Sequence, residues 1–508
     1  MQKKIIILCT VILIVVMEAL FALIGALMPG PFTGTVTDAE TNEPIANVSV
    51  SDGRNVVKTD ENGAYTLPGY SKSRFVTVTT PAGYWTENYY IPVTKDRETY
   101  DFRLDKSEKT AQADHSFLQI SDSEIGAKGV GAWIEHVRDT VKETDPAFLI
   151  HTGDICYEDG LKQHIKDMNT ENMGVPVRYV IGNHDYVAGK YGEALFESIY
   201  GPVWYSFDVG NVHYVVTPFQ TGADYASGYN KNDRWKWLEN DLANVEPGMK
   251  VVMFNHTKAP SDDYVLSYGL KKLDLKEHDL IAWVYGHYHY NYITETDGVL
   301  NISTGRPDCG GIDSSASGSR LISITANGQV STQMYYYDFE QPQAPDGANW
   351  SAQLEGNLLF ADPLAVGNQI FAATVDDDYP RTCGVYSLNA ADGSVNWFFK
   401  TLNSVKNKLV YANGKIVAQD CEGTVYCLNA ETGALLWQKK VDLGGSLGTS
   451  SGLCADGSTV YAGCAASITA LDLETGDTRW NTRRGKGENS PVSYTHSEPT
   501  RLRCISYA

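Results

Sequence analysis

The 508-residue chain has 62 acidic and 41 basic residues, which gives a formal net charge of −21 at pH 7. A nucleic-acid-binding protein needs a basic face, so this balance argues against nucleic acid as a partner, and no such binding is expected. The chain is too long for one ordinary domain, and its length indicates three or four of them.

The amino-terminal segment, residues 1–29, predicts export. Lys3 and Lys4 precede the apolar run Ile5–Met28, in which Glu18 is the single ionisable residue. This run is long enough to span a bilayer, whereas the apolar part of a cleaved signal peptide is usually shorter. We therefore expect a membrane anchor, with a cleaved signal as the alternative. Lysines before the run and an acidic body after it place that body outside the cytoplasm, at the cell surface or in the periplasm.

Residues 32–104 predict short strands. Runs such as Phe32–Val36 carry β-branched residues and are separated by Gly, Asn and Asp. The segment Ile45–Val50, followed by Thr59–Tyr65, resembles the regulatory-like β-sandwich first seen beside carboxypeptidases. The resemblance implies a structural or spacer role. The polar stretch Leu104–His115 is interpreted as a linker.

From residue 116 to residue 337 the pattern changes to apolar runs with helix-like stretches between several of them. Gly131–Lys142 and Arg234–Leu242 are two such predicted helices. The apolar runs are Phe117–Ile120, Ala147–Ile150, Val177–Ile181, Val251–Phe254 and Leu280–Tyr285. Continuous apolar strands alternating with helices predict an α/β domain in which a sheet is buried on both faces. In such sheets the chemistry gathers at the strand ends.

Five short polar motifs follow these five runs. They are Asp122-Ser123-Glu124, Gly153-Asp154-Ile155-Cys156-Tyr157, Gly182-Asn183-His184-Asp185, Asn255-His256 and Gly286-His287-Tyr288-His289. Ten of the eleven histidines lie between His115 and His289. Asp, Asn and His together are the residue types that hold a pair of divalent metal ions. We therefore predict a two-metal hydrolytic site.

The set resembles the calcineurin-like metallophosphoesterase superfamily over roughly residues 116–335. The resemblance implies a central two-layered sheet sandwich, and it implies that Asp154 bridges two divalent ions. The other implied ligands are Asp122 and His289 for the first ion, and Asn183, His256 and His287 for the second. His184 would face the substrate and stabilise the phosphoryl charge or protonate the leaving group, with Asp185 orienting its ring. Metal-bound hydroxide would then attack a phosphate mono- or diester.

The first motif departs from the family pattern, which is usually Asp-x-His. Here the third position is Glu124, which can ligate and, as a charged oxygen donor, would favour manganese or iron over zinc. Alternatively, Glu124 points away and Tyr157 ligates, as the matching tyrosine does in purple acid phosphatases. A packing role for Tyr157 is favoured over ligation. The identity of the two ions (Mn, Fe or Zn) stays open.

Residues 346–484 contain a repeat whose Asp-Gly or Thr-Gly turns each lead to a tryptophan. Trp350, Trp397, Trp437 and Trp480 follow at intervals of forty to forty-seven residues, which is typical of one four-stranded propeller blade per repeat. The unit resembles the repeat of pyrroloquinoline-quinone dehydrogenase propellers and of related non-enzymatic propellers. We predict a partial propeller in which each tryptophan packs between blades, without the quinone. Residues 485–508 form a basic, irregular tail.

The chain is thus predicted to be multidomain, with a β-sandwich, a metallophosphoesterase-like α/β domain and a partial β-propeller. The predicted function is that of an exported phosphoesterase acting on a small-molecule or cell-envelope phosphate ester. The alternative is a cell-surface binding protein whose phosphoesterase domain is inactive. The intact ligand positions other than Glu124 weigh against that alternative. Six cysteines (Cys383, Cys421, Cys427, Cys454, Cys464, Cys504) lie near the carboxyl end, where export would permit disulfides.

Overall fold

The structure is a computed structural model that describes residues 30–483, except 125–129, 219–222, 224, 269, 308–316, 338–343, 345, 359–360, 442–449 and 465–466. It divides into two compact units, residues 1–339 and 340–508. The predicted anchor, residues 1–29, and the tail, residues 485–508, lie outside the described residues. In the part of the chain that is described, no helix is long and apolar enough to cross a membrane.

The amino-terminal region consists of two four-stranded sheets, with strand orders β4-β1-β8-β6 and β3-β2-β5-β7. In β1 (Phe32–Asp38) every second residue is buried, so one face of the strand packs inward. The other strands are β2 (Ser49–Ser51), β3 (Val56–Lys58), β4 (Ala64–Leu67), β5 (Phe75–Val78), β6 (Tyr84–Trp85), β7 (Tyr90–Pro92) and β8 (Phe102–Lys106). The predicted linker, Leu104–His115, instead contains the end of β8 and the short helix α2 (Glu108–Ala111).

The central region contains two mixed sheets. The first has the order β11-β10-β9-β20-β21, and the second has the order β12-β13-β14-β17-β19-β18. The first comprises β9 (His115–Ile120), β10 (Phe148–His151), β11 (Val177–Tyr179), β20 (Gly318–Ile324) and β21 (Val330–Tyr336). The second comprises β12 (Tyr205–Val209), β13 (Val212–Val216), β14 (Lys250–Phe254), β17 (Leu280–Tyr285), β18 (Tyr292–Thr296) and β19 (Val299–Ser303). This is the predicted two-layered sheet sandwich.

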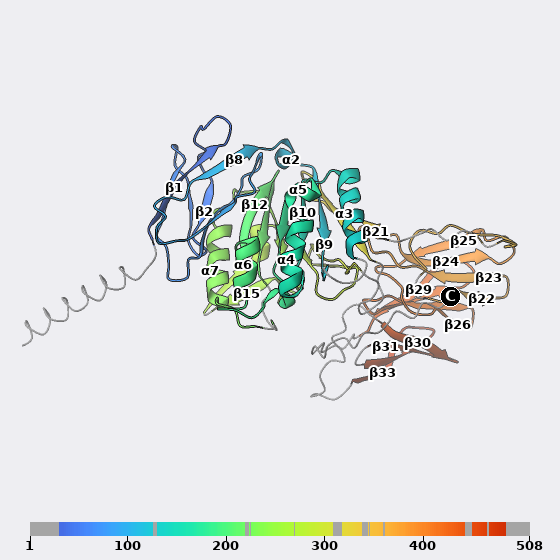
Figure 1. The fold of residues 1–508 in the computed structure, drawn as a ribbon. Helices are drawn as coiled ribbons and strands as arrows, with labels where there is room; N and C mark the ends of the chain where they lie inside the picture. Colours follow the sequence, from blue (N-terminus) through green and yellow to red (C-terminus); the bar gives the residue numbers. More distant parts are fainter. Residues whose placement is uncertain are drawn as a thin grey trace, which may run out of the picture. The chain divides into compact units, whose positions relative to one another are not determined.

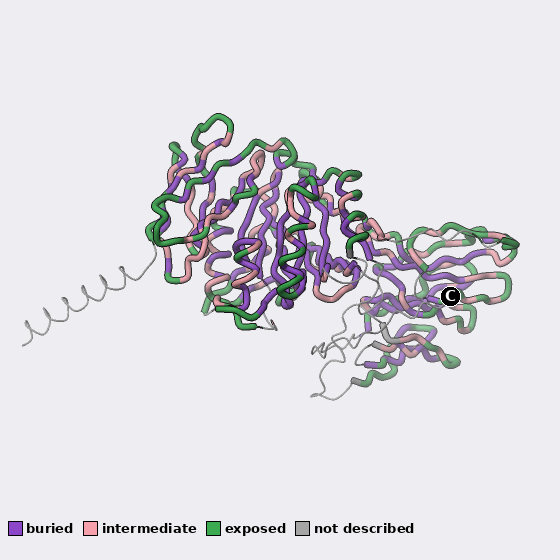
Figure 2. Tube along the Cα trace, viewed as in Figure 1, coloured by how far each residue is buried: buried purple, intermediate pink, exposed green. Residues whose placement is uncertain are grey.

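An aromatic layer joins the two central sheets. Phe117 and Phe148 of the first sheet stack with ring centroids 4.9 Å apart. Phe254 and Tyr214 of the second sheet meet them edge-on, with Phe254 5.4 Å from Phe117 and Tyr214 5.0 Å from Phe148. The strands that carry these rings are almost entirely buried (Figure 2). The sheets are therefore packed face to face through large apolar side chains.

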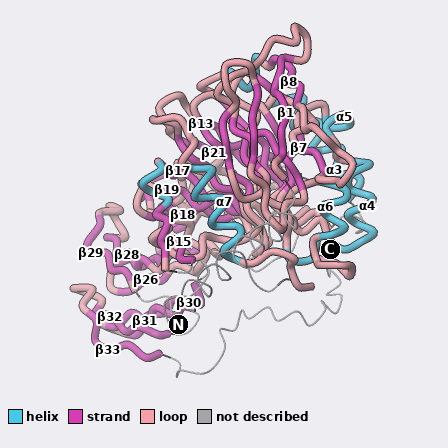
Figure 3. The backbone as a smooth tube through the Cα atoms, turned by 90° about the vertical axis from the view of Figure 1, so that its left-hand side faces the viewer, coloured by secondary structure: helices cyan, strands magenta, loops and turns pink. Residues whose placement is uncertain are grey.

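Helices cover the outer faces of the two sheets. In the rotated view, α3, α4 and α6 lie together on one side of the central strands, and α7 lies apart from them (Figure 3). The helices are α3 (Val130–Thr144), α4 (Tyr157–Asp167), α5 (Thr170–Met173), α6 (Ala194–Tyr200) and α7 (Lys231–Leu242), with the short 3-10 turns η1 (Asn183–Asp185) and η2 (Leu275–His278) and the hairpin β15 (Val265–Tyr268) and β16 (Lys271–Asp274). The predicted helices 131–142 and 234–242 correspond to α3 and α7.

The amino-terminal sheets are bound tightly to the central region, so the two form one unit (Figure 1). Arg74 donates to Glu193 and Glu197 at 3.1 and 2.7 Å. Arg178 is 3% exposed, and its guanidinium lies over the ring of Tyr89 at 4.4 Å. These contacts combine charge, cation–π attraction and burial, so the β-sandwich is an integral part of the body that carries the predicted metal ligands.

The described residues of the carboxyl-terminal unit form three four-stranded sheets in which successive strands are neighbours. Their strands are β22 (Leu364–Val366), β23 (Gln369–Ala373), β24 (Gly384–Asn389), β25 (Val395–Lys400), β26 (Val410–Ala412), β27 (Lys415–Gln419), β28 (Thr424–Asn429), β29 (Leu435–Lys440), β30 (Ser450–Asp456), β31 (Thr459–Cys464), β32 (Ser467–Asp472) and β33 (Thr478–Arg483). Trp397 Nε1 donates to the carbonyl of Ala430 in the next sheet, and Trp437 does the same to Leu473. The predicted packing of tryptophans between blades is confirmed.

Five cysteines whose side chains are described carry free thiols: Cys156, Cys383, Cys421, Cys427 and Cys454. Burial raises the pKa of the Cys421 thiol to about 12, so this buried sulfur stays protonated.

Candidate metal centre

The predicted ligands follow strands of both central sheets. Parallel strands β9, β10 and β11 of the first sheet end shortly before Asp122, Asp154 and Asn183. Parallel strands β14 and β17 of the second sheet end shortly before His256 and His287. The carboxyl ends of parallel strands lie at the same edge of a sheet. The five loops therefore converge on one edge of the sandwich.

The backbone at these loops is unusual. Asp122, Glu124, Asp154, His287 and His289 have φ of 50°, 42°, 55°, 72° and 56°. Residues other than glycine rarely adopt this left-handed conformation, and such strain persists only where the surroundings impose it. The recurrence of this conformation at five predicted ligands marks these loops as a candidate functional site.

Two motif glycines allow the loops to approach one another. A Cβ on Gly153 would lie 2.5 Å from Nδ1 of His256, and a Cβ on Gly286 would lie 1.8 Å from Oγ of Ser121. Neither distance leaves room for a side chain. The glycines before Asp154 and His287 are therefore required by packing between the loops.

Two groups of side chains place ligand atoms within 4.8 Å of one another. One group is Asp154, His256 and His287, and the other is Asp122, Asp154 and His289. Nε2 of His256 is 3.1 Å from Oδ2 of Asp154, and Nε2 of His289 is 3.2 Å from Oδ1 of Asp122. A carboxylate shared by two ligand groups is the arrangement that bridges a pair of divalent ions. The donor set therefore fits two metals.

Asn183 supplies a further sign of a metal. Its side-chain oxygen Oδ1 is buried and has no hydrogen-bond partner. A buried polar oxygen without a hydrogen-bond partner destabilises the fold, and a bound metal ion would supply the missing partner. The adjoining His184 donates its backbone N–H to Oδ1 of Asp154 at 2.9 Å, which fixes this loop against the shared carboxylate. The geometry supports the predicted ligand role of Asn183.

Other hydrogen bonds orient the ligands. Nδ1–H of His256 donates to the carbonyl of Thr152 at 2.8 Å, which leaves Nε2 to face Asp154. The backbone N–H of His287 donates to Asp122, 3.2 Å from Oδ1 and 3.0 Å from Oδ2. Partners of this kind fix the tautomer and ring direction of a metal-binding histidine.

The surroundings shift the pKa values of two histidines of the site in opposite directions. Burial, together with the charge of His256, lowers the pKa of His287 to about 4. Burial opposes a charge on His256, but Asp154 and Asp122 outweigh it and raise its pKa to about 9. Burial also opposes ionisation of Asp122, yet His289 and His256 hold its pKa below the ordinary value. A metal-binding imidazole must be neutral, so a metal ion bound at His256 would displace a proton from this ring.

Asp185, predicted to orient the ring of His184, holds the backbone of two loops. Its carboxylate accepts the N–H groups of Asp154 and Gly182 at Oδ2, at 3.0 and 2.8 Å, and that of Cys156 at Oδ1, at 2.8 Å. Burial, reinforced by Asp154, raises the pKa of Asp185 to about 7. The 3-10 turn η1 directs this side chain into the protein, where it ties the loop after β10 to the loop after β11.

Glu124, predicted as a metal ligand, belongs to neither of the two ligand groups among the described residues. Its Oε2 instead accepts a hydrogen bond from Nη2 of Arg306 at 2.7 Å. Tyr157, for which a packing role was favoured, is 57% exposed, which is too much for a core residue. Its ring lies 5.3 Å from that of His184, so it borders the predicted substrate-facing histidine.

The sequence did not single out Arg306. Nη1 of this residue is 3.4 Å from Nδ1 of His289, so the guanidinium borders the ligand group. Arg306 follows β19, which pairs in parallel with β17, and its loop therefore leaves the sheet at the same edge as the ligands. The position of Arg306 shortly after an apolar strand could have identified it as a candidate site residue, because β19 runs parallel to β14 and β17.

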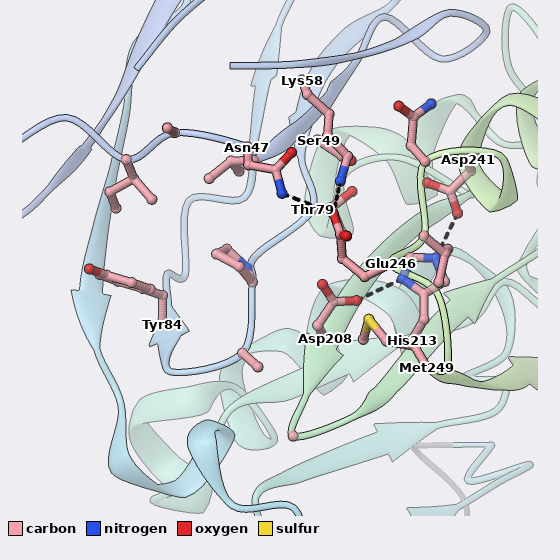
Figure 4. Close-up of a pocket in the computed structure, with 18 residues that line it drawn as sticks. Asn47, Ser49, Lys58, Thr79, Tyr84, Asp208, His213, Asp241, Glu246 and Met249 are labelled. Carbon is pink, nitrogen blue, oxygen red and sulfur yellow. Dashed lines mark hydrogen bonds and ion pairs between the residues drawn. The ribbon is translucent and has the colours of Figure 1, made fainter. Parts of the chain in front are cut away.

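A separate cavity of about 330 Å³ lies between the β-sandwich and the central region (Figure 4). The predicted metal ligands do not line it. His213 stands between two carboxylates there, with Nδ1 2.7 Å from Asp208 and Nε2 2.9 Å from Asp241. Glu246 of the central region accepts hydrogen bonds from Asn47 and Lys58 of the sandwich. The cavity belongs to the joint between the two parts rather than to the metal centre.

Three family models match the chain. Residues 30–107 match the N terminal of calcineurin-like phosphoesterase, and residues 115–291 match the calcineurin-like phosphoesterase model itself. Residues 343–501 match the model described as outer membrane protein assembly factor BamB. The candidate metal centre therefore lies in a calcineurin-like phosphoesterase domain. The chain adds a strand-rich amino-terminal region to that domain, and a BamB-like, propeller-type repeat domain follows it.

The curated relatives match only parts of the chain. The tetrathionate hydrolase of Acidithiobacillus ferrooxidans is 24% identical over 172 residues, covering 28% of this chain and 34% of that protein. BamB of Yersinia pestis is 26% identical over 153 residues, covering 30% and 36%. The chain thus spans about a third of the length of these relatives. Among solved structures, a dimetal phosphatase from Danio rerio is 12% identical with a TM-score of 0.32, covering 43% of this chain and 95% of that one.

Proposed function

We propose that the protein hydrolyses a phosphate mono- or diester with the help of two divalent metal ions. The observation that carries the proposal is the pair of ligand groups that share Asp154. The buried, unpaired side-chain oxygen of Asn183 is a second observation in its favour. When bound, two such ions polarise phosphoryl oxygens and lower the pKa of a water so that it becomes a nucleophile near neutral pH. The match of residues 115–291 to calcineurin-like phosphoesterases supports the same reaction class.

The side chains of the site have separate tasks in this proposal. Asp154 holds the two ligand groups together, and Asp185 fixes the backbone of its loop. His184 is 9% exposed and follows Asn183 directly, so its ring borders the ligand set. An imidazole can stabilise phosphoryl charge or donate a proton to the leaving oxygen, because histidine titrates near physiological pH. The nitrogen and oxygen donors suit manganese, iron or zinc.

We further propose that the protein acts outside the cytoplasm, held to the membrane by residues 1–29. The basic residues before the apolar run and the acidic body after it favour this orientation. Its repeats are similar to BamB, which is named an outer membrane protein assembly factor, and this supports an envelope context. The substrate would then be a small phosphate ester or an envelope component.

The test uses the full chain, stripped of metal and reloaded separately with Mn²⁺, Fe²⁺ or Zn²⁺. Turnover of a chromogenic phosphate monoester and a chromogenic diester is measured beside metal content. Asp154→Ala should abolish turnover and lower the bound metal, whereas Asp139→Ala, on the exposed face of α3, should change neither. A protein that binds no metal would overturn the proposal and favour the binding-protein alternative.

A further inference from the structure

The departure in the first motif has a structural counterpart in the loop after β19. Glu124 and Arg306 form an ion pair with 2.7 Å between Oε2 and Nη2, and their side chains are 28% and 19% exposed. Nη1 of Arg306 is turned towards the ring of His289, which belongs to the ligand group of Asp122 and Asp154. A positive and a negative side chain thus stand together at the border of the metal centre.

We propose that Glu124 is the anchor of Arg306 rather than a metal ligand, and that Arg306 binds a phosphoryl oxygen of a phosphate monoester. This inference rests on the phosphoesterase function proposed above. It adds a residue that determines specificity and names the class of ester.

The first argument is charge. A glutamate where the family usually has histidine adds a negative charge beside Asp122 and Asp154, and a lone carboxylate there would repel an anionic substrate. Arg306 cancels that charge at a distance of 2.7 Å. The Glu124–Arg306 pair has no net charge. The net charge of the site is therefore the same as it would be with a neutral side chain at position 124 and no arginine beside it.

The second argument is the shape of the guanidinium. Arginine has five N–H donors in a planar fork, a geometry that matches phosphate as well as carboxylate. Glu124 holds the fork by Nη2, and this contact sets the direction of Nη1 towards His289. An arginine held in this way loses less conformational entropy on meeting an anion than a freely rotating one.

The third argument separates monoesters from diesters. A monoester has three non-bridging oxygens and a diester has two. Two bound metal ions would polarise phosphoryl oxygens of either ester, and the additional, negatively charged oxygen of a monoester would give Arg306 an acceptor that a diester lacks. Arg306 is therefore expected to stabilise the monoester complex and to contribute little for a diester. A charge-assisted hydrogen bond of ordinary strength corresponds to about 10- to 100-fold in kcat/KM.

The experiment compares Arg306→Ala, Arg306→Lys and Glu124→Gln with Arg138→Ala. Arg138 is a matched control because it forms a similar pair with Glu135, at 2.6 Å, in helix α3. Each full-length variant is loaded with metal. Its metal content, its kcat and KM for a monoester and a diester, and its affinity for inorganic phosphate by calorimetry are then measured.

Arg306→Ala should lower kcat/KM for the monoester about 10- to 100-fold and weaken phosphate binding, with the diester changed by less than about 3-fold. Arg306→Lys should restore part of the loss, because it keeps the charge without the fork. Glu124→Gln should keep both metal ions while phosphate binding weakens. Arg138→Ala should match the parent in every measurement.

Three results would overturn the inference: loss of a metal ion in Glu124→Gln, equal losses for both esters in Arg306→Ala, or no change in Arg306→Ala. If the parent protein turns over neither ester, the proposed function fails. The calorimetric phosphate affinity of Arg306→Ala then still decides whether Arg306 binds an anion.

Discussion

The two carboxylates around the buried His213 ring predict a specific loss of stability in alkaline solution. Burial opposes a charge on this ring, but Asp241 and Asp208 outweigh it and raise the pKa of His213 to about 10, against an ordinary 6.5. A folded pKa above the unfolded one means that the stabilisation is fully present below about pH 6.5. It is lost progressively as the pH rises through 10.

The size of the effect follows from the two pKa values. A pKa difference of one unit corresponds to about 1.4 kcal/mol, so the charged ring contributes at most about 5 kcal/mol to the free energy of unfolding at low pH. Between pH 7 and pH 9 roughly half of this contribution, about 2.5 kcal/mol, should disappear. His213 is 3% exposed, so solvent screens the interaction little.

The assay is denaturant unfolding of the full chain from pH 6 to pH 10, with His213→Gln as the variant that cannot titrate. The difference in unfolding free energy between parent and variant should shrink steadily as the pH rises. Titration of the parent by NMR, with labelled histidine, gives the pKa of His213 directly and needs no variant. A free-energy difference that stays constant from pH 7 to pH 9, or an NMR pKa near 6.5, would refute the reasoning.

Two further predictions concern the loops and the repeats. Asp185→Asn should weaken metal affinity about 10- to 100-fold, because it removes an acceptor from backbone N–H groups beside the ligands; a fall in kcat at unchanged metal affinity would favour the predicted role of orienting His184. Gly433→Ala should destabilise the carboxyl-terminal unit in calorimetry more than Gly414→Ala. Both glycines have φ near +73°, so the backbone strain of an alanine is the same at both positions. Of the two, Gly433 alone would place its Cβ against a ring, 2.6 Å from Cδ2 of Trp397. Equal melting temperatures in the two variants would show that this packing contributes nothing.

Much of the metal centre could be predicted because local pattern and topology agree. Apolar runs of four to six residues predict buried strands, and polar residues directly after such runs lie at the sheet edge. That argument places Asp122 and Asp154 at one edge of the first sheet, and His256 and His287 at one edge of the second, without any knowledge of side-chain packing. The repeat likewise predicts that tryptophans pack between blades, because similar units stack in similar ways, and the structure shows Trp397 against Gly433 of the next repeat.

The contacts that the sequence could not predict are those made across loops. Asp185 is adjacent to His184 in the sequence, which suggests a partnership, and the structure shows in addition that its carboxylate accepts hydrogen bonds from backbone N–H groups of another loop. The partner of Glu124 lies 182 residues away at Arg306, and no local pattern pairs them. Leu104–His115 is polar, yet it contains the short helix α2, in which Thr110 is buried and donates to the carbonyl of Tyr84 in the sandwich.

The geometry of the metal centre is a property of the core as much as of the motifs. Asp154 follows a strand of the first sheet and His256 follows a strand of the second, yet their ligand atoms are 3.1 Å apart. That distance is set by how closely the sheets pack, and the aromatic layer around Phe117 and Phe254 fixes their separation. A close-packed layer resists sliding because any shift opens voids or forces clashes. The motifs supply the chemical groups, and the interleaved rings hold the two halves of the site in register.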